Sequence, residues 1–275
     1  GKVKIQQLTP YQIQAYYNQI MREKGLSSNT VYKHHILLHT ALKMAHRQKL
    51  LPENPIDLVE APHQQLPSQS YYNPKQLNKL FRAVEGDWLE IVVKLAGYLG
   101  LRRSEICGLR WEDVDLENGV IQIQCVRTTA GGKVVEKQPK SESSIRKLGI
   151  AGISDLVDLL REERFNQLQQ KKQLGKAYWD SGYVVVKKDG SPCQPNQVTN
   201  IFRQFIQLHG LPHITIHGLR HTFASVANSA KVPLVDIGKA LGHKDITITG
   251  RIYTHLFDQT HQEVLNMVAS RICIE

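Results

Sequence analysis

The sequence predicts a mainly α-helical protein with one small antiparallel β-sheet, organised as two domains. Amphipathic helical patterns, several with capping residues at their ends, recur along most of the chain. Residues 119–150 instead contain short runs rich in Val and Ile, separated by turn residues. Residues 61–70, "APHQQLPSQS", have two prolines, no Asp, Glu, Lys or Arg and no periodicity, and this composition indicates a linker.

The composition limits the classes of protein to be considered. A chain of 275 residues is long enough for two domains, at about 150 residues per domain. No uncharged apolar run approaches the roughly 18 residues that span a bilayer, and even "LEIVVKLAGYLGL" is interrupted by Lys94. We therefore expect a soluble protein. The formal net charge of +10 is compatible with a polyanionic partner, although many basic proteins bind no nucleic acid.

The four cysteines are scattered along the chain. They lack the paired spacing of zinc sites and small disulfide scaffolds. We expect reduced, buried thiols in a cytoplasmic protein, at Cys107, Cys125, Cys193 and Cys273.

The first domain contains two predicted helices. Thr9 is placed to cap the first one, Pro10 lies in its first turn and Gly25 ends it. The second follows within residues 27–50. Its predicted apolar face consists of Val31, Leu38, Ala41, Leu42 and Ala45. The opposite face carries Lys33, His34, Arg47 and Lys49 and suits solvent as well as a polyanion.

The second domain begins with a helix capped by Asn73 and started by Pro74. An apolar helical stretch and the short "RRSEICGL" follow. Three runs, residues 119–126, 133–138 and 144–150, then predict a three-stranded antiparallel sheet. Helical patterns return at residues 155–170, 194–210 and from 217 to the end.

Several kinds of chemistry lack support in the sequence. His213, His217 and His221 are spaced by four residues, but the segment after Pro212 begins as extended chain and contains no H-E-x-x-H pattern, so zinc binding is disfavoured. No G-x-S-x-G elbow supports a nucleophilic serine. No Gly-rich phosphate loop supports chemistry that depends on a nucleoside triphosphate.

The segment "HGLRHTFAS", residues 217–225, concentrates positive charge at the predicted start of a helix. His217 and Arg220 can project from one side of that helix start, where the backbone N–H groups already attract an anion such as phosphate. The alternative is that His217 caps the helix and Arg220 pairs with a carboxylate.

Further motifs occur in a characteristic order. "GLRRSEICGLRWEDVD" places Arg102 near Glu105, "QPKSESSIRKLGI" contains Lys140 in a turn, and "LGHKDITITGRIYTH" sets Tyr253 ten residues after His243. With the H-x-L-R-H-T box, these segments resemble the tyrosine recombinases, which include phage integrases, Xer-type recombinases and conjugative-transposon integrases. The resemblance covers almost the whole chain and is nearest in style to the transposon and phage integrases.

The resemblance implies a set of site residues. The first catalytic arginine corresponds to Arg102 rather than Arg103, and the hairpin lysine to Lys140, with Lys133 and Lys137 as weaker rivals. The implied catalytic set is Arg102, Lys140, His217, Arg220, His243 and Tyr253, supported by Glu105. Thr30, Lys33 and His34 become candidate DNA contacts.

The resemblance also implies a reaction. Tyr253 would attack a phosphodiester to form a 3′-phosphotyrosine and a free 5′-hydroxyl, which a second strand could then use for rejoining. Arg102 and Arg220 can hold the phosphate oxygens as fixed cations, so neither a metal ion nor ATP is expected. A type IB topoisomerase, or a catalytically silent DNA-binding protein of the same fold, are the alternatives.

The implied architecture is a two-domain clamp on duplex DNA. Residues 1–64 correspond to a helical, SAM-like core-binding domain, 65–72 to a linker and 73–275 to the catalytic domain. Expected partners are double-stranded DNA, further copies of the chain in a dimer or tetramer, and an accessory factor such as an excisionase. Such integrases often carry an arm-binding domain before the core-binding domain, and the start at Gly1 suits a chain without it. We expect a bacterial cytoplasmic protein associated with the nucleoid.

Overall fold

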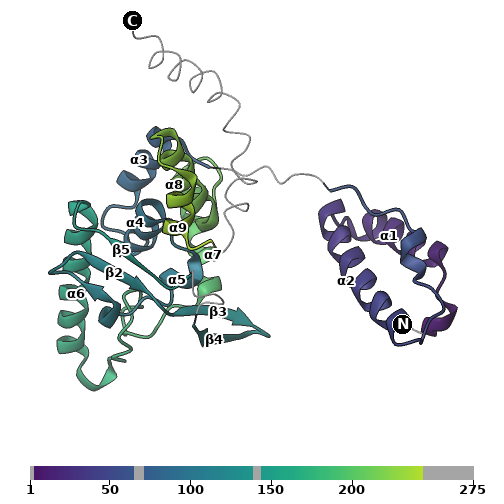
Figure 1. Cartoon of the computed structure of the whole chain (residues 1–275). Coiled ribbons are helices and arrows are strands. Elements are labelled where there is room, and N and C mark those ends of the chain that lie inside the picture. Colours follow the sequence, from purple (N-terminus) through teal and green to yellow (C-terminus); the bar gives the residue numbers. More distant parts are fainter. Residues whose placement is uncertain (1–2, 65–70, 139–143, 244–275) are drawn as a thin grey trace, which may run out of the picture. The chain divides into compact units, whose positions relative to one another are not determined.

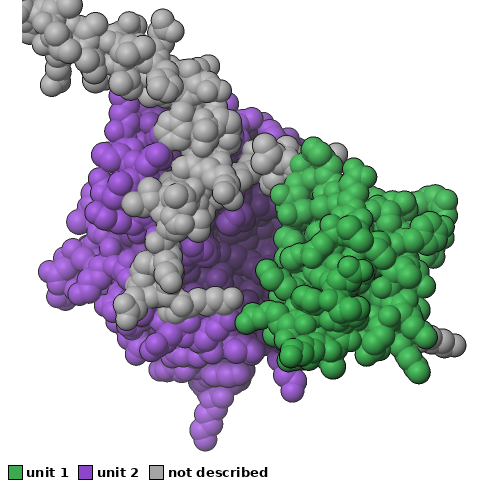
Figure 2. All heavy atoms as spheres, turned by 45° about the vertical axis from the view of Figure 1, so that its right-hand side comes forward, with its two compact units in different colours: residues 1–68 green, residues 69–275 purple. Residues whose placement is uncertain are grey.

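The computed structural model describes residues 3–64, 71–138 and 144–243. The chain divides into two compact units, residues 1–68 and 69–275, which Figure 2 shows in different colours. Each unit has its own hydrophobic core. Helices predominate and the sheets are small and antiparallel, which confirms the fold class predicted from the sequence.

Unit 1 is built on two helices. The helical segments in it are η1 (Ile5–Gln7), α1 (Pro10–Lys24), α2 (Ser28–Arg47) and η2 (Pro55–Leu58). Thr9 caps α1 by accepting a hydrogen bond from the backbone N–H of Gln12, and the side-chain Oε1 of Gln12 accepts one from the backbone N–H of Thr9. Gly25 ends the helix with a left-handed φ of 61°. Both predicted ends of α1 are confirmed.

The core of unit 1 lies between α1, α2 and the segment that follows α2. Its buried members are Ile13, Tyr17, Ile20, Val31, Leu42, Ala45, Leu51 and Ile56. Leu38 is partly buried against them, as predicted. Ala41 is exposed, which corrects the predicted apolar face. The buried stripe on α2 is narrow, and a residue one position before Leu42 is turned about 100° away from it.

Unit 2 contains most of the helices. They are α3 (Pro74–Ala83), α4 (Glu90–Leu99), α5 (Arg103–Ile106), η3 (Trp111–Asp113), α6 (Ser154–Leu174), η5 (Gly175–Ala177), α7 (Pro195–Leu208), α8 (Ile216–Ser229) and α9 (Leu234–Leu241). The predicted start of α3 is confirmed, because Asn73 accepts a hydrogen bond from the backbone of Gln76 and Pro74 occupies the first position.

Helix α4 lies at the centre of unit 2. Nearly all of its residues are buried, and even Lys94 is 5% exposed. The ammonium of Lys94 lies 2.7 Å from carboxylate oxygens of both Glu90 and Asp155, so that α4 is tied to α6 by charge as well as by apolar contact. The C-terminal end of α4, at Gly100, is therefore fixed in the core, and the chain continues from this point.

The strands form two separate sheets. Strands β1 (Val114–Asp115), β2 (Val120–Ile123) and β5 (Arg146–Gly149) make a three-stranded antiparallel sheet in the order β1-β2-β5. Strands β3 (Val126–Ala130) and β4 (Lys133–Lys137) form a two-stranded hairpin. Figure 1 shows this hairpin projecting from unit 2.

The prediction of one sheet from residues 119–126, 133–138 and 144–150 is therefore wrong for residues 133–138, which lie in the separate hairpin. Gly131 and Gly132 both have positive φ angles, 55° and 78°, which closes a tight two-residue turn. That turn folds β4 directly back on β3, and Val126 pairs with Lys137 at the far end of the hairpin. The third place in the predicted sheet is taken by β1 instead.

The close approach of α5 to β3 gives a test of this packing. A methyl group added at Gly108 would lie 2.7 Å from the carbonyl oxygen of Cys125 and 2.9 Å from the Cα of Val126, both backbone atoms. We expect Gly108→Ala to lower the free energy of unfolding by roughly 1–3 kcal/mol, measured by urea titration. Gly152→Ala is the matched control, since its added methyl group would meet nothing within 4 Å. Equal losses in the two variants would contradict the prediction.

Candidate active site

Arg102 and Glu105 are positioned by the end of α4. Gly100 ends that helix with a φ of 61°, and two residues later Arg102 is the N-cap of the short helix α5. One oxygen of Glu105 accepts from the backbone N–H of Arg102 at 2.8 Å, and the other accepts from Nη1 of Arg102 at 2.7 Å. Glu105 thus fixes both the backbone and the side chain of Arg102. Its supporting role in the reaction stays a prediction.

The carboxylate of Glu105 is 1% exposed. Burial alone would raise its pKa, but hydrogen bonds from Arg146 and Arg102, with their positive charges, lower the pKa below its ordinary value. Glu105 is therefore an anion at neutral pH. Arg146 contributes two of these hydrogen bonds, from Nη1 at 3.2 Å and from Nη2 at 3.0 Å.

Arg220 is held inside the unit by backbone carbonyls. It lies on α8, is 2% exposed, and donates from Nη1 to the carbonyl of Gly100 and from Nη2 to the carbonyl of Leu241, both at 2.7 Å. These carbonyls end α4 and α9, where the negative end of each helix dipole lies. Arg220 therefore joins three helices at one point.

The start of α8 differs from one of the alternatives raised by the sequence. Thr215, not His217, caps the helix, and its hydroxyl accepts from the backbone N–H of Gly218 at 2.9 Å. His217 therefore does not cap α8. Its ring contacts His221 edge-on, with centroids 4.6 Å apart.

His243 follows α9 directly. Gly242 ends that helix with a φ of 66°, its carbonyl accepts a long hydrogen bond of 3.4 Å from Nη2 of Arg102, and the backbone N–H of His243 bonds to Gly238. The tertiary structure thereby brings Arg102, Glu105, His217, Arg220 and His243 into one region of unit 2.

The charges of this region act on its histidines. Burial lowers the pKa of His243 to about 4, and the guanidinium groups of Arg220 and Arg102 add to the effect. The pKa of His217 is lowered by the same causes, partial burial first, although its side chain keeps an exposed edge. His243 is neutral at pH 7, and the lowered pKa of His217 favours its neutral ring, which is the form that can accept a proton.

A cavity of about 400 Å³ opens beside Arg102. Its lining comes from α5, from the β3–β4 hairpin and from the approach to β5: Arg102, Ser104, Glu105, Val126, Thr128, Lys137 and Ser144. Lys137, one of the two weaker lysine candidates, thus lies on the same cavity as Arg102. Sequence patterns gave no role to Thr128, whose hydroxyl-bearing side chain also lines it.

Other predicted residues lie elsewhere. Lys140 and Tyr253 are outside the described residues, so that their roles stay predictions. In unit 1, the hydroxyl of Thr30 bonds to Ser27 and Nδ1 of His34 to the hydroxyl of Tyr16, while Lys33 is exposed. The predicted DNA contacts of these residues also stay predictions. Cys107 and Cys193 are buried, whereas Cys125 is only half-buried.

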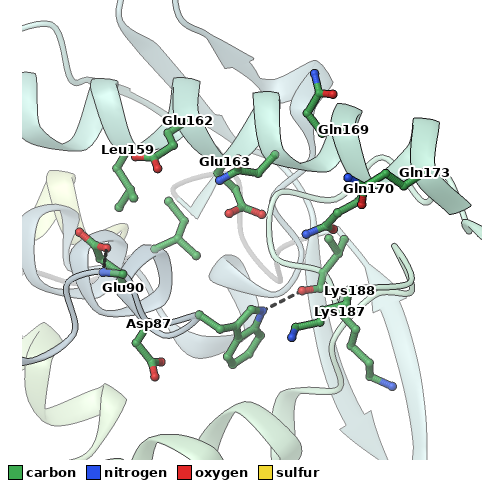
Figure 3. Close-up of a pocket in the computed structure, with 15 residues that line it drawn as sticks. Asp87, Glu90, Leu159, Glu162, Glu163, Gln169, Gln170, Gln173, Lys187 and Lys188 are labelled. Atoms are coloured by element: carbon green, nitrogen blue, oxygen red, sulfur yellow. Dashed lines mark hydrogen bonds between the residues drawn. The ribbon is translucent and has the colours of Figure 1, made fainter.

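A second cavity, of about 430 Å³, lies between α6, the approach to α4 and residues 186–188. Figure 3 shows carboxylates and amides around it, among them Glu162, Glu163 and Gln170. The indole N–H of Trp88 donates to the carbonyl of Val186 at its edge, at 2.8 Å. None of the predicted site residues that the structure describes lines this cavity. Its four carboxylates outnumber its two lysines, Lys187 and Lys188, so the lining as a whole does not favour a phosphate.

The described part of the chain holds neither a grouped set of metal ligands nor a membrane-spanning helix. Across residues 3–64, 71–138 and 144–243, no three His, Cys, Asp or Glu side chains are grouped so that they could hold a metal ion. In the same part of the chain, no helix has the length and apolar character needed to cross a membrane.

Comparison with known proteins identifies the family. Residues 71–260 match the phage integrase family model. The chain belongs to the phage integrase family. It is a tyrosine recombinase, an enzyme that cleaves and rejoins DNA strands, which confirms the prediction made from the motifs.

Individual relatives agree with this assignment. A XerC-like tyrosine recombinase of Caldanaerobacter subterraneus subsp. tengcongensis is 29% identical over 272 residues, which cover 92% of this chain and 69% of that protein. The ICEBs1 integrase of Bacillus subtilis is 26% identical over 267 residues, covering 96% and 71%. Both relatives are named as a recombinase or an integrase, and neither a topoisomerase nor a silent DNA-binding protein is favoured.

The fold of this recombinase is also that of a solved integrase. The Tn1549 transposon integrase, in complex with a circular intermediate DNA, matches with a TM-score of 0.81 and 22% identity, over 97% of this chain and 88% of that one. The arrangement of helices and small sheets described above is therefore the fold of a transposon integrase.

The buried histidines give the recombinase a predicted pH dependence. The pKa of His221 is lowered to about 4, by burial first and then by His217 and Arg220, whereas an unfolded histidine titrates near 6.5. Between these values the unfolded chain binds the proton first, so stability falls as the pH drops from 6.5 towards 4, with a slope of at most about 1.4 kcal/mol per pH unit for one histidine.

His221→Phe tests this. In urea titrations from pH 8 to pH 4.5, the free energy of unfolding of the variant should fall less steeply below pH 6.5 than that of the native chain. Above pH 7 the two curves should run parallel. Identical slopes below pH 6.5 would contradict a lowered pKa for His221.

Proposed function

We propose that this tyrosine recombinase is the integrase of a conjugative transposon or phage, and that it integrates and excises the element through a 3′-phosphotyrosine intermediate on Tyr253. The observation that carries the proposal is the convergence of Arg102, Arg220, His217 and His243 where α4, α8 and α9 meet. Two fixed guanidinium groups and two histidines form a site for one phosphodiester.

Each residue has a chemical role in this proposal. Arg102 and Arg220 bind the non-bridging oxygens and stabilise the negative charge of the pentavalent transition state. The hydroxyl oxygen of Tyr253 attacks phosphorus and its proton passes to His217, while Lys140 protonates the leaving 5′-oxygen. His243, neutral at pH 7, donates a hydrogen bond to a non-bridging oxygen.

The reaction conserves the energy of the broken bond. One phosphodiester is exchanged for a phosphotyrosine ester, and a 5′-hydroxyl from a second strand reverses the step and completes strand exchange. No ATP is therefore needed. Because the guanidinium groups already supply positive charge, no metal ion is needed either.

The proposal extends to the assembly on DNA. The Tn1549 integrase was solved with DNA, and a lambda integrase was solved as a dimer on a core site. For this chain we infer that residues 1–64 are a core-binding domain and that, joined by residues 65–72 to a catalytic domain of residues 73–275, they clamp duplex DNA as part of an oligomer. The family model begins at residue 71, which supports that division. The enzyme would act on DNA in the bacterial cytoplasm.

The nucleophile can be tested without knowledge of the natural site. A pool of nicked duplexes with random sequence is incubated with the chain, and DNA that resists denaturing washes is recovered and sequenced. We expect the native chain to capture a common sequence as a protease-sensitive adduct and Tyr253→Phe to capture none. An adduct that survives the substitution would remove Tyr253 as the nucleophile.

The captured duplex then tests the independence from metal and ATP. Adduct formation should proceed at the same rate in EDTA as in magnesium, both without nucleotide. A loss of the adduct in EDTA that is restored by a divalent cation would contradict the proposed clamp of two arginines.

The same duplex separates a recombinase from a topoisomerase. With two labelled partner duplexes, the integrase should yield joined products in which strands come from both partners. Relaxation of supercoiled DNA with no strand exchange would instead indicate a topoisomerase-like activity.

A further inference from the structure

Arg146 is a buried arginine that the reaction described above does not use. It is the first residue of β5, and its side chain is 7% exposed. All three guanidinium nitrogens donate hydrogen bonds: Nε to the carbonyl of Ala240 at 2.7 Å, Nη1 to Ser144 at 3.1 Å and to Glu105 at 3.2 Å, and Nη2 to Glu105 at 3.0 Å. A planar fork bound at so many points has little freedom to move.

The partners of Arg146 include Glu105, which holds Arg102, and the last turn of α9, which leads to His243. Glu105 accepts from Arg146 with both oxygens and from Arg102 with both oxygens, so that the carboxylate lies between two arginines. Ala240 is in the last turn of α9, two residues before Gly242, whose carbonyl contacts Arg102. Arg146 thus touches the support of Arg102 and the helix that leads to His243.

The carboxylate of Glu105, which both arginines share, determines the direction of the Arg102 guanidinium. With both oxygens of Glu105 partly engaged by Arg146, Arg102 uses Nη1 on this carboxylate and directs Nη2 to the long 3.4 Å bond with Gly242. That long bond is weak and can be exchanged for a phosphate oxygen. Without Arg146, the buried anion would have Arg102 as its remaining cation and would draw the guanidinium towards α5, away from a phosphate.

We propose that Arg146 is a positioning residue for strand cleavage, which holds Glu105, and through it the Arg102 guanidinium, in register with the end of α9. The proposal rests on the proposed function, because it assigns Arg102 to the phosphate. Removal of Arg146 alone leaves the buried carboxylate of Glu105 with one cation fewer and also costs stability, so the test must separate the positioning of Arg102 from a loss of folding.

The test compares four single variants with the native chain on the captured duplex. Arg146→Met removes every hydrogen bond and keeps an apolar stem of similar length, and Arg146→Lys keeps the charge but not the fork. Arg102→Met is the reference for a lost phosphate contact. Arg103→Met is the matched control, because the guanidinium of Arg103 bonds to Asn196 and Thr199 on α7.

We expect Arg146→Met to bind the duplex as tightly as the native chain and to form the adduct on the order of 100-fold more slowly, the usual scale for a displaced catalytic group. Arg146→Lys should recover only part of the rate, since an ammonium cannot make the bidentate contact. Arg103→Met should cleave at the native rate. If Arg146→Met is unfolded at the assay temperature, Arg146→Lys carries the same comparison.

A neutral substrate distinguishes positioning from general loss of structure. Replacement of the scissile phosphate by methylphosphonate removes one negative charge, so that cleavage depends less on Arg102. The defects of Arg102→Met and Arg146→Met should then both shrink by at least about tenfold. The double variant that combines Arg146→Met with Arg102→Met should cleave no more slowly than Arg102→Met alone, because the two residues act as a unit.

Three results would overturn the proposal. The first is a defect of Arg146→Met that is equal on the phosphodiester and the methylphosphonate, and the second is a defect that adds in full to that of Arg102→Met. Failure of the native chain to form any adduct would instead refute the proposed function, so the two failures are distinguishable. The third is a native rate for Arg146→Met, which would also refute the positioning role.

Discussion

The position of Arg220 is the constraint on which the rest of the site depends. A guanidinium that is 2% exposed must have its donors satisfied, and the carbonyls of Gly100 and Leu241 do so at the ends of α4 and α9. Those helix ends carry negative dipole charge, so the cation and the two helices stabilise one another. Arg102 lies two residues after Gly100, and His243 lies two residues after Leu241. The two hydrogen bonds of Arg220 therefore fix the positions of both residues.

A second charge network lies around this contact. Glu105, buried and ionised, sits between the guanidinium groups of Arg102 and Arg146. Buried ion pairs contribute little net stability, because the desolvation of the charges offsets their attraction. Such a network instead fixes the orientation of its side chains, because bidentate hydrogen bonds restrict orientation more than an apolar contact does. The site is therefore rigid where phosphate would bind, on helix ends anchored in the core.

The distribution of charge separates the reactive cavity from the other large one. Arg102 and Lys137 line the first together with a single carboxylate, Glu105, so that positive charge exceeds negative charge there and suits a polyanion. Glu162 and Glu163 on α6 border the other, where burial raises the pKa of Glu163. Volume alone does not distinguish the two cavities, which measure about 400 and 430 Å³. Chemical character does, and it supports the cavity beside Arg102 as part of the proposed reactive region.

The sequence by itself determined the features that arise between near neighbours in the chain. Thr9 and Asn73 cap their helices through residues three positions away, and the order of motifs was enough to predict the family. Only the tertiary structure decided that Arg220 bonds to the carbonyl of Gly100 from 120 residues away and that Arg146 meets Glu105 from 41 residues away. The physical reason is range: a cap or turn follows from local geometry, whereas the partner of a buried charge is chosen by whichever distant segment the core packing brings beside it.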